Sequence, residues 1–372
     1  MIPGLDGLRA LAFLLVFAFH TNYLTFGWVG VQFFFVLSGF LITGILLDMK
    51  KSLPPRIYFV KFYGRRFLRI FPLYYFYLLV MTVVSVWLIS ISYRPAYMHI
   101  FQSQVWYAVF YVYDFYFGTI AAKYSFFLDH FWSLSIEEQF YLFWPMLILL
   151  APERWLKKLF LTFIVLGPIF RIAFLIIYRS GIFRFLNDPV STSLYPMPFS
   201  HVDAFAFGAY ISRYSIPKAR QQFFLLLGTL PVIGYASQYI ATGNIGDLSA
   251  FGYPLLMPEA YQFIWGYTLL GYFFMVVIYA VVHYGLFINL LEWPVMRYLG
   301  KISYGLYIYH FPVIWFSTRI RDLGLSERDA KPLVFVIAFI VTLLLASLSY
   351  RFLEKPLLNL KDRFFSLKPD SI

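Results

Sequence analysis

The sequence predicts an all-α polytopic membrane protein with about ten transmembrane helices. Its 372 residues are 61% hydrophobic and only 13% charged, whereas soluble domains are about 45–50% apolar and about 25% charged. The mean hydropathy is +0.72, and apolar runs of the roughly 20 residues that cross a bilayer recur along the chain. Helices satisfy their own backbone hydrogen bonds in lipid, so such a chain is expected to span the membrane as helices.

Ten apolar runs have a length suited to a membrane-spanning helix. They lie near residues 8–25, 28–47, 71–92, 134–151, 159–178, 200–214, 222–241, 261–283, 302–318 and 332–350. Residues 93–133 fit no single run, because an aromatic stretch there is interrupted by Asp114 and flanked by polar stretches. We interpret that region as an outer loop with a re-entrant or interfacial segment. No internal repeat or long linker is evident, so residues 1–372 are expected to form one integral-membrane domain.

Basic residues are distributed unequally between the two sides of the predicted spans. Eight Lys and Arg residues fall in the segments on one side. Twenty of the 30 fall in the segments on the other side, which are 48–70, 153–158, 213–220, 297–301 and 351–372. Cytoplasmic loops carry an excess of Lys and Arg, so these segments and both termini are predicted to be cytoplasmic. Topology thus explains much of the net charge of +12, and no nucleic-acid partner is predicted.

The first apolar run carries two ionisable residues, Arg9 and His20. They are eleven residues apart, which on a helix is about 20° beyond three turns, so they share one face about 16 Å apart along the axis. Asp6 lies roughly on the same face. His20, near mid-depth, is either a general base or a neutral histidine bonded between helices. Arg9 either helps to hold an extended ligand or extends to the membrane interface.

The basic segment 50–75 contains Arg66 and Arg69, three residues apart. On a helix these two share a face at the cytoplasmic mouth, and paired guanidinium groups offer bidentate donors to phosphates. We therefore interpret them as a site for a phosphorylated cytoplasmic donor. The alternative is a purely topological or lipid-headgroup role. Pro72 is expected to mark the entry into the third span.

The stretch HFWSLSIEEQFYLFWP opens the fourth run. Ser133 or Ser135 could cap a helix there, with Glu137 and Glu138 in its first turn. Capping accounts for one glutamate, but not for both at the opening of an apolar span, where Glu137 and Tyr141 share a face. Glu137 is therefore a candidate for a catalytic or orienting role.

Other polar residues lie in or near the predicted spans. Asp203 either caps a helix or belongs to a site, and His310 either bonds between helices or belongs to a site. Arg171 and Glu354 are expected to pair with other charged groups. The other histidines lack a metal-ligand spacing, the chain has no cysteine, and no nucleotide-binding or nucleophile-elbow motif occurs. The sequence therefore predicts no metal site, nucleotide hydrolysis or serine-hydrolase chemistry.

In their order along the chain, these motifs resemble the acyltransferase 3 family of integral-membrane bacterial O-acyltransferases, which modify surface glycans and some secreted small molecules. The run LDGLRALAFLLVFAFH matches the family's Arg/Lys-x10-His signature with Arg9 and His20. The motifs that follow in the family's order are GVQFFFVLSGFLI, RRFLRIFPLYY, WSLSIEEQFYLFWP, DAFAFGA, ISYGLYIYHFPV and RFLEKP. The resemblance spans nearly the whole chain.

The resemblance implies transfer of an acyl group, most often acetyl, from cytoplasmic acyl-CoA to a hydroxyl of a surface or lipid-linked glycan such as O-antigen or exopolysaccharide. It also implies a multi-pass protein of the bacterial inner membrane, with acyl-CoA as co-substrate, no permanently bound cofactor and no metal. His20 would act as a base or as an acyl carrier. The implied roles are catalysis for His20, Arg9 and Glu137, acyl-CoA binding for Arg66, Arg69, Arg9 and Tyr74, and support or acceptor binding for Asp6, Ser38, Trp132, Ser133, Asp203 and His310.

The sequence departs from the family pattern at two positions. Gln32 stands where an acidic residue is common, and His201 stands where an arginine is common two residues before the aspartate. Both departures are expected to bear on acceptor recognition. The fused extracytoplasmic SGNH hydrolase-like domain of some members is absent from the sequence, so the membrane domain is expected to act alone or with a separate partner. The alternative function is a proton-coupled carrier or flippase for a glycan or lipid.

Overall fold

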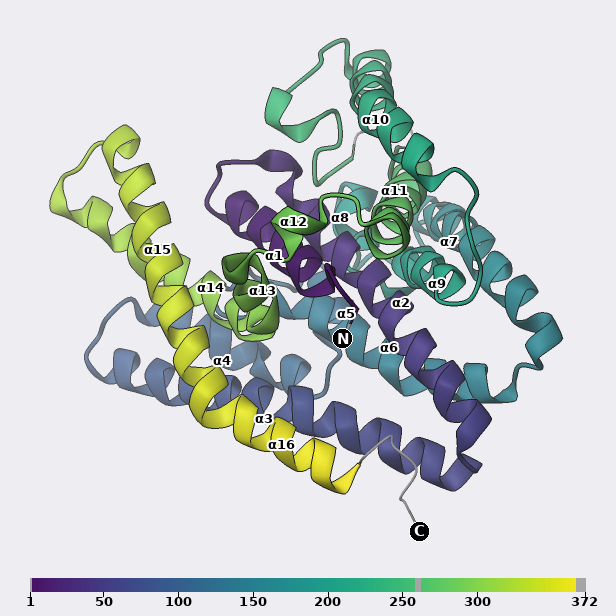
Figure 1. Ribbon diagram of the computed structural model, residues 1–372. Coiled ribbons are helices and arrows are strands. Elements are labelled where there is room, and N and C mark those ends of the chain that lie inside the picture. Colours follow the sequence, from purple (N-terminus) through teal and green to yellow (C-terminus); the bar gives the residue numbers. More distant parts are fainter. Residues whose placement is uncertain (1, 258–261, 366–372) are drawn as a thin grey trace. The chain divides into compact units, whose positions relative to one another are not determined.

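The computed structural model describes residues 2–257 and 262–365 (Figure 1). In these residues the chain is helical, and the only β-bridge is an isolated pairing of Thr119 with Leu186. The α-helices are α1 (Leu5–His20), α2 (Val29–Ser52), α3 (Pro55–Ser90), α4 (Pro95–Val109), α5 (Tyr113–Phe117), α6 (Phe131–Leu150), α7 (Leu156–Arg179), α8 (Val190–Leu194), α9 (Val202–Ile211), α10 (Ala219–Thr242), α11 (Gln262–Tyr284), α12 (Ile288–Leu291), α13 (Pro294–Lys301), α14 (Ser303–Ser317), α15 (Glu327–Ser349) and α16 (Lys355–Phe364). Short 3₁₀ turns lie at η1 (Thr25–Trp28), η2 (Glu153–Trp155), η3 (Pro198–His201), η4 (Leu248–Ala250) and η5 (Thr318–Leu323), and one π-turn lies at η6 (Tyr350–Glu354).

The chain folds as two compact units, each built from segments that are far apart in the sequence. The first unit lies within residues 1–44, 117–122 and 151–303. The second lies within residues 45–116, 123–150 and 304–372. Helix α1 belongs to the first unit, and helices α3 and α6 belong to the second. The predicted site residues are therefore divided between the two units.

Six helical segments of the described residues are long and apolar enough to cross a membrane. They are Thr25–Ser52, Pro55–Ser90, Glu153–Arg179, Ala219–Thr242, Gln262–Tyr284 and Glu327–Lys361. Each corresponds to one of the ten predicted spans, although the first residue of the predicted span 261–283 lies outside the described residues. The predicted class, an all-helical multi-pass membrane protein, is confirmed for the described residues.

The four other predicted spans also coincide with helices. Helices α1, α9 and α14 have 16, 10 and 15 residues. Helix α6 has 20 residues, and because it begins at Phe131, Glu137 and Glu138 lie in its interior and not in its first turn as predicted. Because a helix rises about 1.5 Å per residue, a helix as short as α9 covers only about half of a bilayer core of about 30 Å. The total of ten crossings and the cytoplasmic position of both termini therefore stay predictions.

The third span begins earlier than the sequence indicates. Helix α3 starts at Pro55, a position where proline's missing N–H leaves no bond unmade, and it continues through Pro72 to Ser90. Pro72 lies in the interior of this helix, and its place at the entry into the membrane span stays a prediction. The preceding basic residues are consequently part of the same helix. Arg66 and Arg69 therefore share a helical face, as predicted.

The predicted outer region 93–133 contains two helices, α4 and α5, which confirms a helical segment within it. A buried hydrogen bond attaches this region to the rest of the second unit, since the hydroxyl of Tyr77 on α3 donates to the carbonyl of Phe127 at 2.7 Å. Within the region, the amide of Gln104 donates to the carbonyl of Lys123 at 2.7 Å. These bonds satisfy polar groups away from water and order the loop. A re-entrant or interfacial placement in the bilayer stays a prediction.

Helix α1 packs directly against α12 and α13 within the first unit (Figure 1). Two glycines permit this approach, since a Cβ atom on Gly7 would collide with the backbone of Leu291 and one on Gly300 would collide with the backbone of Asp6. The absence of side chains lets the backbones come into contact, as small residues do in membrane helix pairs. The packing fixes the first turns of α1, which carry Asp6 and Arg9.

Helices α2 and α9 also cross in backbone contact. A Cβ atom on Gly39 would collide with the carbonyl of Phe205, and one on Gly208 would collide with the carbonyl of Val36. The short distance between these helices, which small residues make possible, allows side chains of α2 to reach those just before α9.

Candidate functional site

Arg9 and His20 lie on one continuous helix, α1, which is the condition for the predicted shared face. A guanidinium nitrogen of Arg9 lies 2.5 Å from a carboxylate oxygen of Asp6, and these side chains are 23% and 14% exposed. His20 is the last residue of the helix and is half-buried. Its ring packs edge-on against Phe19, with 5.1 Å between the ring centroids. Asp6 therefore holds Arg9 in place, while the imidazole lies about three turns farther along the helix.

The beginning of α1 also contacts an acidic residue that sequence reasoning missed. The backbone N–H of Gly4 donates to the Glu292 carboxylate at 2.6 Å, and Arg297 lies 3.5 Å from the same carboxylate. A carboxylate at a helix N-terminus satisfies an unpaired N–H and interacts favourably with the helix dipole. Because Glu292 is 288 residues away in the sequence, no local pattern pointed to this contact.

The two departures from the family pattern meet in the first unit. Nδ1 of His201 lies 2.8 Å from Oε1 of Gln32, and Nε2 lies 2.7 Å from the carbonyl oxygen of Tyr195. Both side chains are buried. Ser38, predicted to support the site, lies on the same helix as Gln32 and is half-buried. The first unit thus contains a buried hydrogen-bonded pair near the α2 and α9 crossing.

Asp203 forms a buried ion pair with Arg171, in agreement with the prediction that Arg171 pairs with a charged group. The two charged atoms are 2.7 Å apart, and both side chains are fully buried. Arg171 also donates to the carbonyls of Ser200 at 2.5 Å and Ile264 at 2.9 Å, and Thr268 donates to Asp203 at 2.6 Å. Because its carboxylate is engaged in this network, Asp203 ties α7, α9 and α11 together.

In the second unit, Arg66 lies close to the predicted catalytic glutamate. Its guanidinium carbon is 5.5 Å from the centroid of the Tyr141 ring, and the hydroxyl of Tyr141 donates to Glu137 at 2.5 Å. Glu137 and Glu138 both interact electrostatically with Arg66. The predicted shared face of Glu137 and Tyr141 is confirmed, and α3 and α6 together hold a cation beside two carboxylates.

Arg69 and Tyr74 lie farther along α3. Arg69 interacts electrostatically with both Arg66 and Glu354. An ion pair between Arg69 and Glu354 stays a prediction. Tyr74 is fully buried, its hydroxyl donates to the carbonyl of Ala108 at 2.7 Å, and its ring stacks on Tyr111 with a centroid distance of 4.3 Å. The structure therefore gives Tyr74 a packing role, and its contribution to donor binding stays a prediction.

A buried cluster joins the start of α6 to α14 and includes two residues that sequence reasoning passed over. The hydroxyls of Ser133 and Tyr307 are 2.6 Å apart. Nδ1 of His310 lies 2.6 Å from the carbonyl oxygen of Tyr307, and the rings of His130 and His310 are 5.4 Å apart at their centroids. Trp132, which precedes Ser133 on α6, is also buried. The spacing of three between Tyr307 and His310 is the signal that could have revealed this cluster.

Two buried carboxylates outside the spans were also not predicted as site residues. Asp129 accepts from the hydroxyl of Tyr113 at 2.9 Å and from the N–H of Ser125 at 2.9 Å. Asp114 accepts from the amide of Gln139 at 3.0 Å. Burial disfavours the charged form and raises the pKa of the Asp129 carboxyl to about 7. It likewise raises the pKa of Asp114 to about 7.

These observations define two sets of candidate groups, one in each unit. The first unit offers an imidazole and a guanidinium on α1, a combination suited to proton transfer and anion binding. The second unit offers two guanidiniums beside two carboxylates on α3 and α6. Among the residues that the structure describes, no group of three His, Asp or Glu side chains is arranged to hold a metal ion.

Comparison with known proteins identifies relatives over nearly the whole chain. A family model described as "Acyltransferase domain" matches residues 2–351. The Bacillus subtilis protein YrhL is 30% identical over 98% of this chain and 56% of its own length. "Peptidoglycan O-acetyltransferase OatA" of Listeria monocytogenes is 30% identical over 96% of this chain and 56% of its own length. "O-acetyltransferase OatA" of Staphylococcus aureus is 29% identical over 99% of this chain and 59% of its own length.

The chain spans somewhat more than half the length of these relatives. No solved structure matches it. The family model nevertheless covers the segments that contain Arg9, His20, Arg66 and Glu137. The chain belongs to the acyltransferase 3 family.

Proposed function

We propose that this protein is a membrane O-acyltransferase that moves an acetyl or other short acyl group from cytoplasmic acyl-CoA to a hydroxyl of a glycan. Membership of an acyltransferase family supports the reaction class. The names of the two OatA relatives support O-acetylation, and the name of the Listeria protein supports peptidoglycan as the first acceptor to test. O-antigen and exopolysaccharide are the other acceptors of the same chemical class.

The reaction requires a base or an acyl carrier, and we assign that role to His20. In direct transfer, the acceptor oxygen forms a bond with the acyl carbon, the carbon–sulfur bond of the thioester breaks, and His20 takes the proton of the hydroxyl. The proton then goes to the departing CoA thiolate. In the alternative, an imidazole nitrogen forms a bond with the acyl carbon as the carbon–sulfur bond breaks and CoA leaves as the thiolate; the acceptor hydroxyl then takes the acyl group as the carbon–nitrogen bond breaks, and its proton goes to the thiolate. The chain has no cysteine that could carry the acyl group instead.

The arrangement of α1 is the observation that carries this proposal. Arg9 and His20 are on one helix, and Asp6 holds the guanidinium at 2.5 Å. A carboxylate partner restricts an arginine to one geometry, which reduces the side-chain entropy lost when an anion binds. The arrangement supports a role for Arg9 as a fixed cation that binds the donor. The imidazole of His20 then lies about 16 Å away along the helix axis.

For the donor, we propose that Arg66 and Arg69 bind the phosphates of CoA. They share a face of α3, and each interacts with acidic residues of the second unit. Guanidinium groups bind phosphate in a bidentate manner, so two of them suit a ligand with several phosphates. Glu137 is proposed as a second catalytic group, because its carboxylate is held by Tyr141 at 2.5 Å.

Purified protein in liposomes, supplied with radiolabelled acetyl-CoA and peptidoglycan fragments, tests the proposal. The wild type should release free CoA and label the acceptor. His20→Ala should lower the rate about 10²- to 10⁴-fold, the typical contribution of a positioned acid or base. His283→Ala is the matched control, since His283 is an exposed histidine in the last turn of α11. Full activity of His20→Ala, with both variants folded, would exclude the assigned role of His20.

A further inference from the structure

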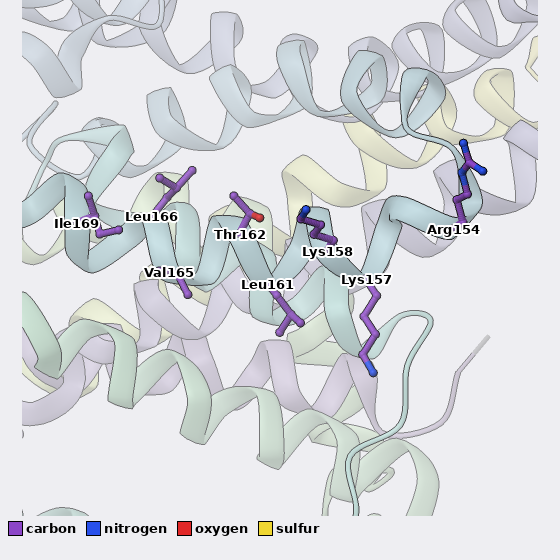
Figure 2. Close-up of a pocket in the computed structure, with 8 residues that line it drawn as sticks. All are labelled: Arg154, Lys157, Lys158, Leu161, Thr162, Val165, Leu166 and Ile169. Carbon is purple, nitrogen blue, oxygen red and sulfur yellow. The ribbon is translucent and has the colours of Figure 1, made fainter.

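A surface groove of about 600 Å³ runs along one face of η2 and α7. Figure 2 shows that its residues form two ridges: Lys157, Leu161 and Val165 extend to one side of the helix, and Lys158, Thr162 and Leu166 extend to the other. Ridges of side chains spaced four residues apart leave such a groove between them. The lining is Arg154, Lys157, Lys158, Leu161, Thr162, Val165, Leu166 and Ile169.

The two ends of the groove have different chemistry. Arg154, Lys157 and Lys158 lie at one end, and the other end, as far as Ile169, is apolar apart from Thr162 (Figure 2). The apolar part lies in the candidate span Glu153–Arg179, and only 22% of the span's apolar 18-residue window is buried inside the protein. The groove therefore combines a cationic end with an apolar end on a largely exposed helix.

The cations are placed where they do not help the helix itself. They lie in η2 and the first turn of α7, and positive side chains at a helix N-terminus interact unfavourably with its dipole. Among the described residues, none of the three lies within 4.0 Å of a carboxylate. The nearest acidic residue along the chain, Glu153, is 3.7 Å from Arg213 instead. An anion from outside the chain would balance these charges.

The length of the groove indicates what kind of anion it fits. From Lys158 to Ile169 the helix rises by about 17 Å, which is close to the depth of one leaflet, or half of a hydrocarbon core of about 30 Å. Trp155 lies at the cationic end, with its ring 4.9 Å from the Lys158 nitrogen, and tryptophan favours the headgroup level of a bilayer. A free phosphate would use only one end of this groove.

From these observations we propose that the face of η2 and α7 is a binding site for one anionic phospholipid. The phosphate of the headgroup contacts Arg154, Lys157 and Lys158, and one acyl chain lies along the groove past Leu161 toward Ile169. The site is separate from the residues proposed for acyl transfer. Its test does not depend on enzymatic activity.

Native mass spectrometry of the detergent-solubilised protein, titrated with phosphatidylglycerol or phosphatidylcholine, tests the site. The wild type should retain phosphatidylglycerol in preference to phosphatidylcholine. Because each basic residue near a membrane surface contributes about fivefold, Lys157→Gln with Lys158→Gln should weaken retention of phosphatidylglycerol about 25-fold. Lys218→Gln with Arg220→Gln removes the same charge from exposed residues at the start of α10 and should have little effect.

A second variant tests the apolar part. Val165→Trp keeps every charge but fills the apolar end, and should also reduce retention of phosphatidylglycerol. Millimolar inorganic phosphate should not displace the bound lipid, because it lacks the acyl chain. The proposal is wrong if the groove variant (Lys157→Gln with Lys158→Gln) and the control variant (Lys218→Gln with Arg220→Gln) lose phosphatidylglycerol equally. It is also wrong if the wild type retains both lipids equally, or if Val165→Trp retains as much phosphatidylglycerol as the wild type.

Discussion

The side chains of Gln32 and His201 are in direct contact, with 2.8 Å between Oε1 and Nδ1, although they are 169 residues apart in the sequence. They are the two positions at which the resemblance to the family predicts a departure from its pattern. Both departures therefore belong to one contact, and a substitution of Gln32 or His201 removes a hydrogen-bond partner of the other residue. This pair is buried where α2 approaches the start of α9.

Replacing Gln32 with leucine should destabilise the protein. The His201 ring loses the amide as a partner, and a buried polar group left without its hydrogen bond costs about 1–3 kcal/mol. Thermal unfolding in detergent measures the effect as a lower Tm. Gln221→Leu, at an exposed position of α10, is the control and should change Tm little. Equal Tm values for the two variants would show that the contact contributes nothing to stability.

The pair of Arg171 and Asp203 should be essential for stability. Asp203→Asn leaves the fully buried guanidinium with a neutral partner, and breaking a buried ion pair costs about 3–5 kcal/mol. The control is Glu153→Gln, which breaks the exposed pair with Arg213 and should cost about 0–1 kcal/mol. Unfolding in mixed detergent and SDS measures both. If Asp203→Asn lowers the free energy of unfolding no more than the control does, Asp203 does not hold α7, α9 and α11 together.

Removal of both donor-site arginines should act on binding more than on the rate at saturation. For Arg66→Ala with Arg69→Ala, the KM for acetyl-CoA should rise more than kcat falls, because each charged hydrogen bond contributes about 1–3 kcal/mol to binding. Lys51→Ala with Arg56→Ala removes the same charge from exposed positions and is the control. Calorimetry of CoA binding checks the assignment directly. Unchanged CoA affinity in the Arg66 and Arg69 variant would refute the phosphate contacts.

Stability should decrease as the pH rises from about 4 to 7, in part because of Asp129. Burial raises the pKa of this carboxyl to about 7, so the folded state binds more protons than the unfolded state between about pH 4 and 7. The stabilisation is thus present at low pH and lost as the pH rises through 7. Asp129→Asn, which keeps an acceptor for Tyr113 and Ser125, should flatten the dependence of Tm on pH.

Asp114 contributes in the same direction, because burial also raises its pKa to about 7. The slope in Asp129→Asn should therefore be reduced rather than abolished. Asp322→Asn changes an exposed aspartate that pairs with Arg94 at 3.3 Å, and should keep the wild-type slope. Identical slopes for Asp129→Asn and the wild type would rule out the proposed proton uptake.

Much of the helical framework could be predicted, because its signals are local. Hydropathy and helical period depend on contiguous residues, so the sequence predicted the helical class, the helix that joins Arg9 to His20 and the shared face of Arg66 and Arg69. Pro72 lies inside α3 and not at its end. Neighbouring groups in a membrane helix can satisfy the backbone carbonyl that a proline leaves unpaired, so a proline need not mark a helix end.

The sequence by itself determined that the chain forms membrane helices and that α1 carries a cation and an imidazole eleven positions apart. Only the tertiary structure decided that His201 contacts Gln32, that Arg171 pairs with Asp203 and that Glu292 reaches Gly4. The free-energy penalty for burying a polar group requires that each of them has a partner. Which partner it has depends on how distant helices pack, and no pattern of neighbouring residues encodes that packing.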